Sequence, residues 1–260
     1  QRVVSSSEVF SIRVNPGINR GYQGSMLKPD GRLARVTAIS GPTIYRGDQF
    51  PQEYVGDGFI PEPAANLVGL WRIQEDGIQL KSTHATYPDP RWEKREFLCS
   101  TDERFRPVNL YTGPDGCLYV CDIYRGILQH KHYVTTFLRK QILERKLDQH
   151  IDVGRVWRVV HEASGKPVRA PALSQASSEG LVQHLAHPNG WVRDTAQRLL
   201  VERRDASSVP ALRKLASASK SHLARIHALW TLRGIGALDA ASVIANFAHP
   251  HPKVRQNAVR

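Results

Sequence analysis

The chain has 260 residues, of which 41% are hydrophobic, and its 36 Lys and Arg residues outnumber 24 Asp and Glu residues to give a net charge of +12. This length is enough for one large domain or two ordinary ones, and the lack of any run of eighteen apolar residues excludes a membrane-spanning helix within this sequence. The positive charge favours anionic partners, although scattered arginines on helices more often form a solvated surface.

Residues 1–161 have the pattern of an all-β, antiparallel segment. Short runs rich in β-branched and aromatic residues alternate with turns of Gly, Pro and Asp. The runs that we expect to be strands are residues 32–37, 43–45, 58–60, 67–73, 117–121 and 155–160. A helical insert is predicted near 134–149, where Leu138, Ile142 and Leu147 lie at helical spacing.

A linker at residues 162–172 contains Gly, Ser and two Pro residues, and paired helices are predicted after it, from 173 to 260. Three similar segments begin at Val192, Ala224 and Val254, which are 32 and 30 residues apart, and another short amphipathic run precedes each of them. A two-helix unit that recurs about every thirty residues indicates an α-solenoid. The pattern resembles short HEAT repeats, and because Arg260 lies inside the third repeat we expect the array to be truncated.

Single residues of these repeats carry two further predictions. Arg193, Arg225 and Arg255 should occupy equivalent positions in successive repeats. His227 and Trp230 lie on a repeat helix, and we interpret them as core or groove residues.

Two stretches of the β-rich part carry a more specific resemblance. The turn GPDG at 113–116 leads into CLYV, and GRVWRV follows at 154–159. They resemble the last blade of the six-bladed propellers of soluble quinoprotein glucose and aldose sugar dehydrogenases. GPTIYRGDQFP at 41–51, followed by GFI at 58–60, resembles their penultimate blade.

One group of proteins resembles this chain more closely in sequence. These are the large propeller–HEAT proteins of planctomycetes and verrucomicrobia that are often labelled membrane-bound dehydrogenases, and the resemblance covers essentially the whole chain. The similarity runs through NPGINRGYQGSMLKPDGRLARVTAISGPTIYRGD, STDERFRPVNLYTGPDG and YRGILQHKHY. It implies that residues 1–161 are the C-terminal blades of a β-propeller and that 173–260 are HEAT-like repeats.

The implied propeller is incomplete. A blade takes roughly 40–50 residues and a propeller at least four blades, so this part holds two to three blades and cannot close a ring. We expect other protein segments or chains to complete it. The first residue is not Met, and we take the start as internal to a longer polypeptide.

The same resemblance implies a function. The chain would be part of a quinoprotein-like dehydrogenase that oxidises sugar or alcohol groups and passes electrons to a cytochrome c domain, with the haem in a segment outside this chain. A periplasmic, secreted or cell-envelope location is implied. The alternative is a non-catalytic propeller and HEAT scaffold that binds protein or anionic polysaccharide. Nucleic-acid binding rests on charge alone, without an aromatic and basic motif, and is the class that we favour least.

Arg104 and Arg106 are the candidate cofactor ligands. In the sugar dehydrogenases, arginines just before the final PDG strand contact the anionic cofactor pyrroloquinoline quinone. The two residues lie on one side of a segment that we expect to be extended, and guanidinium groups hold carboxylates by charge-assisted hydrogen bonds. The competing hypothesis is that they pair with Asp102, Glu103 or a neighbouring blade. The catalytic histidine of those enzymes belongs to an early blade that is absent here, so no catalytic base is assigned.

His130 and His132 are weak candidates for a metal site. Imidazoles at this spacing can chelate a metal from a strand, but no third ligand lies nearby in the sequence. The resemblance also allows calcium, although Asp115 in the PDG turn and Asp122 after the next strand are more often turn-capping carboxylates.

Overall fold

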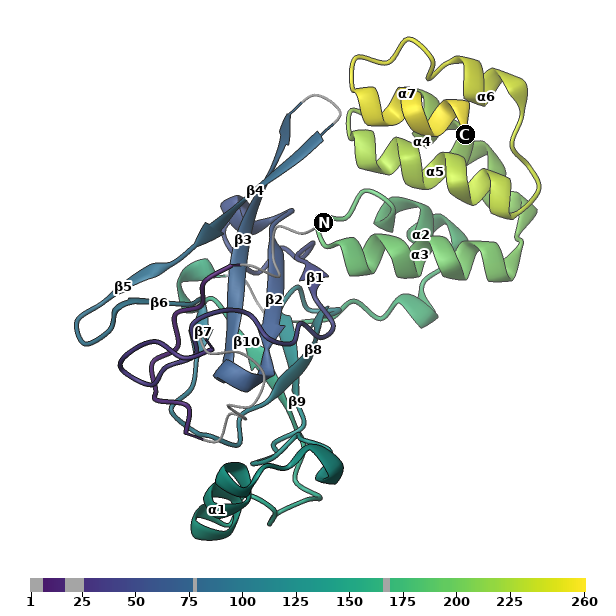
Figure 1. Cartoon of the computed structure of the whole chain (residues 1–260). Helices are drawn as coiled ribbons and strands as arrows, with labels where there is room; N and C mark the ends of the chain where they lie inside the picture. Colours follow the sequence, from purple (N-terminus) through teal and green to yellow (C-terminus); the bar gives the residue numbers. More distant parts are fainter. Residues whose placement is uncertain (1–6, 17–25, 77–78, 166–168) are drawn as a thin grey trace. The chain divides into compact units, whose positions relative to one another are not determined.

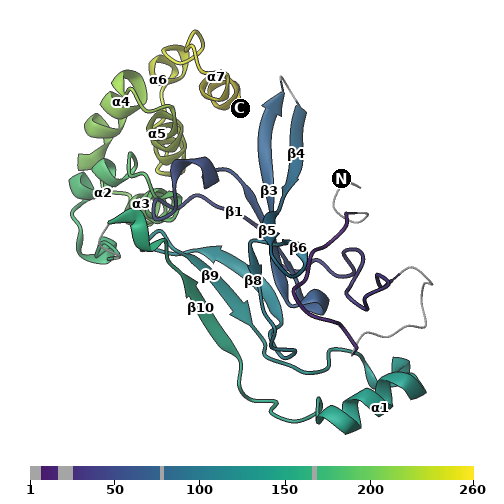
Figure 2. The same cartoon turned by 90° about the vertical axis from the view of Figure 1, so that its left-hand side faces the viewer.

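The computed structural model describes residues 7–16, 26–76, 79–165 and 169–260, which form two compact units (Figures 1 and 2). The β unit consists of Gln1–Tyr45, Pro51–Thr112 and Leu118–His161. The helical unit consists of Arg46–Phe50, Gly113–Cys117 and Glu162–Arg260. A strand-rich part followed by a helical part is therefore confirmed, but two loops of the strand-rich part belong to the helical unit.

Five antiparallel strands form the first sheet of the β unit. The order is β1-β2-β3-β4, and β7 also pairs with β3. The strands are β1 (Thr43–Ile44), β2 (Gly58–Glu62), β3 (Leu67–Asp76), β4 (Gln79–Ala85) and β7 (Leu98–Cys99). A one-turn 3-10 helix joins β2 to β3, and Asn66 ends it in the left-handed conformation with φ 58°. Two further strands, β5 (Tyr87–Asp89) and β6 (Glu93–Arg95), form a separate ribbon.

The second sheet has the order β10-β9-β8 and contains the motifs of the last blade. Its strands are β8 (Pro107–Thr112), β9 (Leu118–Asp122) and β10 (Arg155–Val159), and all pair antiparallel. The GPDG turn joins β8 to β9, with Gly116 at φ 79°. Between β9 and β10 lies α1 (Thr136–Arg145), which begins where Thr135 Oγ1 accepts the N–H of Leu138.

The prediction of a strand at residues 32–37 is wrong. Leu33 and Arg35 form isolated bridges, to Leu27 and Glu8, and no continuous ladder. A tight turn at Gly31, φ 84°, reverses the chain just before this run. Leu33 instead packs into a small core, so its apolar side chain is buried without strand pairing. The core residues around it are Val9, Ala65 and Leu67.

The two sheets share a core in which β2 lies against β8. On the first sheet Phe59 contacts Phe97 edge to face, with ring centres 4.9 Å apart. On the second, Leu110, Leu118 and Val120 lie on the buried face. The described strands curl, as Figure 2 shows, but they do not close into a propeller.

The helical unit contains three helix pairs, as HEAT-like repeats predict (Figure 1). The pairs are α2 (Ser178–His184) with α3 (Gly190–Arg203), α4 (Val209–Ala218) with α5 (His222–Gly234), and α6 (Ala240–Ile244) with α7 (Pro252–Val259). The apolar stripes of the first two pairs meet in one core that includes Leu181, Val192, Leu200, Leu212 and Leu232. Within the described residues, no helix has both the length and the apolar character needed to cross a membrane.

The prediction of equivalent arginines is confirmed. Arg193, Arg225 and Arg255 each lie four residues after the N-cap of the second helix in their pair. Arg193 Nη1 donates to the carbonyls five and six residues back, at 2.8 and 2.6 Å. Arg255 repeats both contacts at 2.8 and 2.7 Å. Arg225 donates from Nε to the carbonyl six residues back, at 2.6 Å. Each arginine thus holds the turn that enters its own helix.

Two loops complete the first repeat of the helical unit. The N–H of Gly190, at the start of α3, donates to the carbonyl of Arg46 at 2.6 Å. The Arg46 guanidinium forms a bidentate pair with Asp194, at 2.8 and 3.0 Å. Asn189 Nδ2 donates to the carbonyls of Gly113 and Pro114 at 3.0 and 3.2 Å. The N-terminus of α3 therefore takes its partners from residues 46–50 and 113–117.

Candidate interaction site

Arg106 is buried and satisfied by main-chain carbonyls. It donates to the carbonyls of Arg125, Pro63 and Gly126 at 2.9, 2.7 and 2.9 Å, and more weakly to that of Ala64 at 3.5 Å. Burial lowers the pKa of its guanidinium to about 10, and the positive charge of a neighbouring arginine acts in the same direction. The side chain thus holds two loops together.

The side chain of Arg104 contacts the C-terminal end of α1. Its Nη2 donates to the carbonyls of Arg145 and Lys146, at 3.4 and 3.0 Å, where the helix dipole favours a positive charge. Its Nε is buried and has no hydrogen-bond partner among the described residues. Glu103, which directly precedes Arg104, forms ion pairs with Arg13 and Arg145.

The two arginines together do not fit an anionic quinone as the chain folds here. Arg104 retains one donor, but Arg106 would have to leave at least three carbonyls before it reached a carboxylate. The quinone role of Arg104 and Arg106 stays a prediction, and the described contacts point to packing instead.

The two metal candidates, His130 and His132, lie next to each other. The rings of His130 and His132 stack with centres 4.9 Å apart, and His130 Nδ1 accepts the N–H of His132 at 3.4 Å. Over residues 7–16, 26–76, 79–165 and 169–260, no three His, Cys, Asp or Glu side chains are grouped so as to hold a metal ion. Asp115 accepts the N–H of Cys117, and Asp122 accepts the N–H groups of Arg106 and Tyr124 and the indole N–H of Trp157, so both act as capping carboxylates.

A histidine backed by a buried carboxylate lies on the first sheet, and sequence reasoning missed it. Glu96 is fully buried, and one of its carboxylate oxygens accepts a hydrogen bond from the N–H of Phe10 at 3.0 Å. Its other oxygen lies 2.7 Å from His84 Nε2, to which it is hydrogen-bonded. The ring of His84 stacks on Trp71 at 4.3 Å, nearly parallel. Gly69 leaves the room for this stack, because a Cβ there would lie 2.5 Å from the Trp71 ring.

An apolar hollow of about 300 Å³ is also lined by Trp71. It is lined by residues of the first sheet that include Ile44, Ile60 and Ile73. No charged side chain lines this hollow, and its polar side chains are the hydroxyls of Thr43 and Ser82, so it offers mainly an apolar surface for packing.

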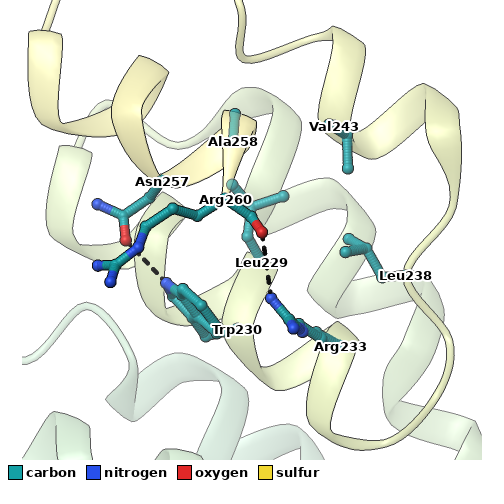
Figure 3. A pocket seen from close by; sticks show the side chains of 8 residues that line it. All are labelled: Leu229, Trp230, Arg233, Leu238, Val243, Asn257, Ala258 and Arg260. Atoms are coloured by element: carbon teal, nitrogen blue, oxygen red, sulfur yellow. Dashed lines mark hydrogen bonds between the residues drawn. The ribbon is translucent and has the colours of Figure 1, made fainter.

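A pocket of about 330 Å³ opens between α5, α6 and α7 of the helical unit (Figure 3). Its apolar lining comes from Leu229 on α5, Leu238 before α6, Val243 on α6 and Ala258 on α7. Because the lining comes from two helix pairs, the pocket follows from the stacking of repeats, and no single stretch of sequence indicates it.

The polar lining of this pocket is basic. It comprises Trp230, Arg233, Asn257 and Arg260, and no Asp or Glu side chain lines the pocket. Trp230 Nε1 donates to Asn257 Oδ1 at 2.8 Å, which fixes the indole ring. Arg233 lies with its guanidinium 5.1 Å from the centre of that ring and donates to the carbonyl of Arg260 at 3.4 Å. The groove interpretation of Trp230 is confirmed.

His227 lies on α5 and faces α3. Its Nδ1 forms a 2.7 Å hydrogen bond with Gln197 Oε1. Burial and the positive charge of Arg193 lower the pKa of His227 to about 4. The imidazole is therefore neutral near pH 7 and belongs to the packing between repeats.

Comparison with known proteins agrees with the two-part architecture. Residues 2–163 match a family model described as a domain of unknown function (DUF7133). Residues 178–260 match the model of HEAT repeats. No curated protein and no solved structure matches the chain.

Proposed function

Since the chain belongs to the DUF7133 family and carries HEAT repeats after that domain, we propose that it is a scaffold that binds a partner protein through its helical unit. HEAT repeats build extended surfaces from stacked helix pairs, and such surfaces serve in protein recognition. The observation that carries the proposal is the pocket between α5, α6 and α7. It combines an apolar lining with one Trp and two Arg residues, the residue types that dominate binding energy at protein interfaces.

We propose in addition that the β unit is part of a β-propeller. Its sheets are antiparallel and lie next to each other, with β2 close to β8, which suits neighbouring blades. The outer face of the second sheet bears Tyr111 and Val156, which are 55% and 67% exposed. Apolar side chains on a sheet face are normally covered, so this face supports packing by a further sheet.

The hypothesis of a quinoprotein-like dehydrogenase remains a prediction from resemblance. It requires a quinone held by Arg104 and Arg106, and the carbonyl contacts of Arg106 weigh against that arrangement. The scaffold needs no rearrangement of the described residues, and it is the function that the geometry supports best.

Site-specific photocrosslinking tests the scaffold. A photoreactive residue replaces Leu238, at the pocket, or Lys214, which is exposed on α4 outside it. In cells that make the protein naturally, we expect position 238 and not position 214 to yield an adduct with one other polypeptide. That adduct should be lost in Arg233→Ala and kept in Arg198→Ala. The scaffold proposal fails if neither position, nor any other exposed position of the helical unit, yields an adduct.

A further inference from the structure

We infer that the pocket between α5, α6 and α7 binds an acidic peptide segment of the partner, in which an apolar side chain lies next to a carboxylate. This inference rests on the scaffold function proposed above and adds the chemistry of the partner. It follows from the size, the lining and the charge of the pocket.

The size and the lining define the apolar anchor. A volume of about 330 Å³ is at the lower end of the range for small-molecule sites, roughly 300–1,000 Å³, and suits one or two side chains rather than a large cofactor. Leu229, Leu238, Val243 and Ala258 offer no hydrogen-bonding side-chain groups. An aliphatic side chain such as Leu matches this surface, because a polar one would lose its water without gaining a partner.

The rim defines the charged neighbour. Arg233 and Arg260 are both exposed at the pocket, and a guanidinium carries five donors, of which Arg233 uses one on the carbonyl of Arg260. Trp230 is held by Asn257 and presents a rigid aromatic surface beside these charges (Figure 3). A carboxylate is the group that guanidinium donors bind best, often in a bidentate manner.

Charge also selects among possible occupants. Residues 178–260 contain 12 Lys and Arg residues and 5 Asp and Glu residues. A second copy of the helical unit would bring like charges together, and a basic segment would be repelled by Arg233 and Arg260. The complementary occupant is therefore an acidic segment of another protein.

Nuclear magnetic resonance of the 260-residue protein provides a site-specific test. The sequence has five Trp residues, so the indole N–H signal of Trp230 can be assigned with Trp230→Phe. The probe is an acetylated 12-residue peptide that repeats Leu-Glu-Glu. Three matched peptides replace Glu by Lys, replace Glu by Gln, or replace Leu by Ala.

We expect the Leu-Glu-Glu peptide to shift the Trp230 signal in a saturable way and the matched peptides to bind much more weakly. Loss of one charge-assisted contact weakens binding about tenfold to a hundredfold. Arg233→Ala and Arg260→Ala should therefore each lower the affinity for the Leu-Glu-Glu peptide by about this factor. Arg198→Ala removes an exposed charge on α3 outside the pocket and should leave the affinity unchanged. Val243→Glu places a carboxylate in the pocket and should abolish binding, and circular dichroism verifies that each variant is folded.

The inference is overturned if the Lys or Gln peptide binds as tightly, or if Arg233→Ala behaves like Arg198→Ala. It is also overturned if the Trp230 signal does not move with the peptide, or moves on dilution because the protein associates with itself. A shift at Trp191 with Trp230 unmoved would place acidic peptides elsewhere on the helical unit. In that case the scaffold stands and the pocket assignment falls.

Discussion

Arg106 is charged yet nearly inaccessible to water. Removing a guanidinium from water is costly, and the carbonyls of Pro63, Arg125 and Gly126 offset that cost by hydrogen bonds of 2.7–2.9 Å. Those carbonyls belong to two loops that are far apart in sequence. One side chain thereby fixes the turn before β3 against the chain after β9.

Replacing Arg106 should therefore lower the stability of the fold. Arg106→Ala leaves at least three buried carbonyls without a donor, and we expect the free energy of unfolding to fall by about 3 kcal/mol or more. Urea denaturation measures this change. Arg104→Ala is the matched control and should cost about 1 kcal/mol or less, because its two carbonyls lie at the end of α1. Equal losses in the two variants would contradict the structural role of Arg106.

His227 should make stability depend on pH. Its pKa is about 4 in the folded chain and about 6.5 when exposed, so the unfolded chain binds the proton first as the pH falls. Stability is then fully present above about pH 6.5 and is lost progressively down to about pH 4. The expected loss from this residue at pH 5 is about 2 kcal/mol relative to pH 7.5.

The measurement is urea unfolding at several pH values with His227→Gln as the comparison. The glutamine keeps a polar group near Gln197 and does not titrate, so its stability should change less between pH 7.5 and 5. The pKa values of His187 and His222 are also lowered, mainly by burial, and these residues contribute in the same direction in both proteins. A variant with the same pH dependence as the parent would rule out His227 as the source.

At the scale of elements, the arginine at the start of each second helix performs one task in three places. Arg225 performs an additional one, because its Nη1 donates to the carbonyl of Ala216 at 3.1 Å and to Asn246 Oδ1 at 3.0 Å. Ala216 lies in α4, and Asn246 follows α6. Arg225 thereby joins the second repeat to the third.

Arg225→Ala should accordingly destabilise the chain more than Arg255→Ala. We expect a loss of about 2–3 kcal/mol for Arg225, and about 1 kcal/mol for Arg255, which is exposed and binds two carbonyls of its own turn. Thermal melts followed by circular dichroism at 222 nm compare the two variants. The reverse order would show that the contact to Asn246 is unimportant.

Local patterns predicted the elements better than the contacts between them. The GPDG turn, β9, β10 and the helix α1 follow from turn residues and periodicity that act over a few residues. The three repeat arginines were found because a repeated motif implies a repeated environment. The carbonyl partners of Arg106 and the pocket around Trp230 could not be found in this way. Both are assembled from segments that approach one another only after the chain has folded.

At the scale of the whole molecule, the division into units does not follow a single cut in the sequence. The chain enters the helical unit at Arg46, at Gly113 and finally at Glu162. The first two of these segments, Arg46–Phe50 and Gly113–Cys117, supply hydrogen-bond partners of Gly190, Asp194 and Asn189 at the start of α3. The start of α3 thus depends on residues that precede it by more than seventy positions.

A fragment of residues 162–260 should therefore be less stable than the same helices in the full chain. It lacks the Arg46 pair with Asp194 and the carbonyls that accept from Gly190 and Asn189. We expect a melting temperature lower by several degrees and faster amide hydrogen exchange at the start of α3. Exchange at the start of α5, for which the described part of the chain shows no such partners, provides the internal control. Identical exchange at α3 in fragment and full chain would contradict the prediction.

The embedded loops also limit how such a gene can be rearranged. A repeat array joined by one linker can be exchanged between relatives as a cassette, by recombination at the linker. Here an exchange at residue 162 would separate Asp194 and Asn189 from Arg46, Gly113 and Pro114, which lie in distant parts of the coding sequence. An incoming array would have to match two loops that it does not encode. The β-rich domain and its first repeat are therefore expected to be inherited together.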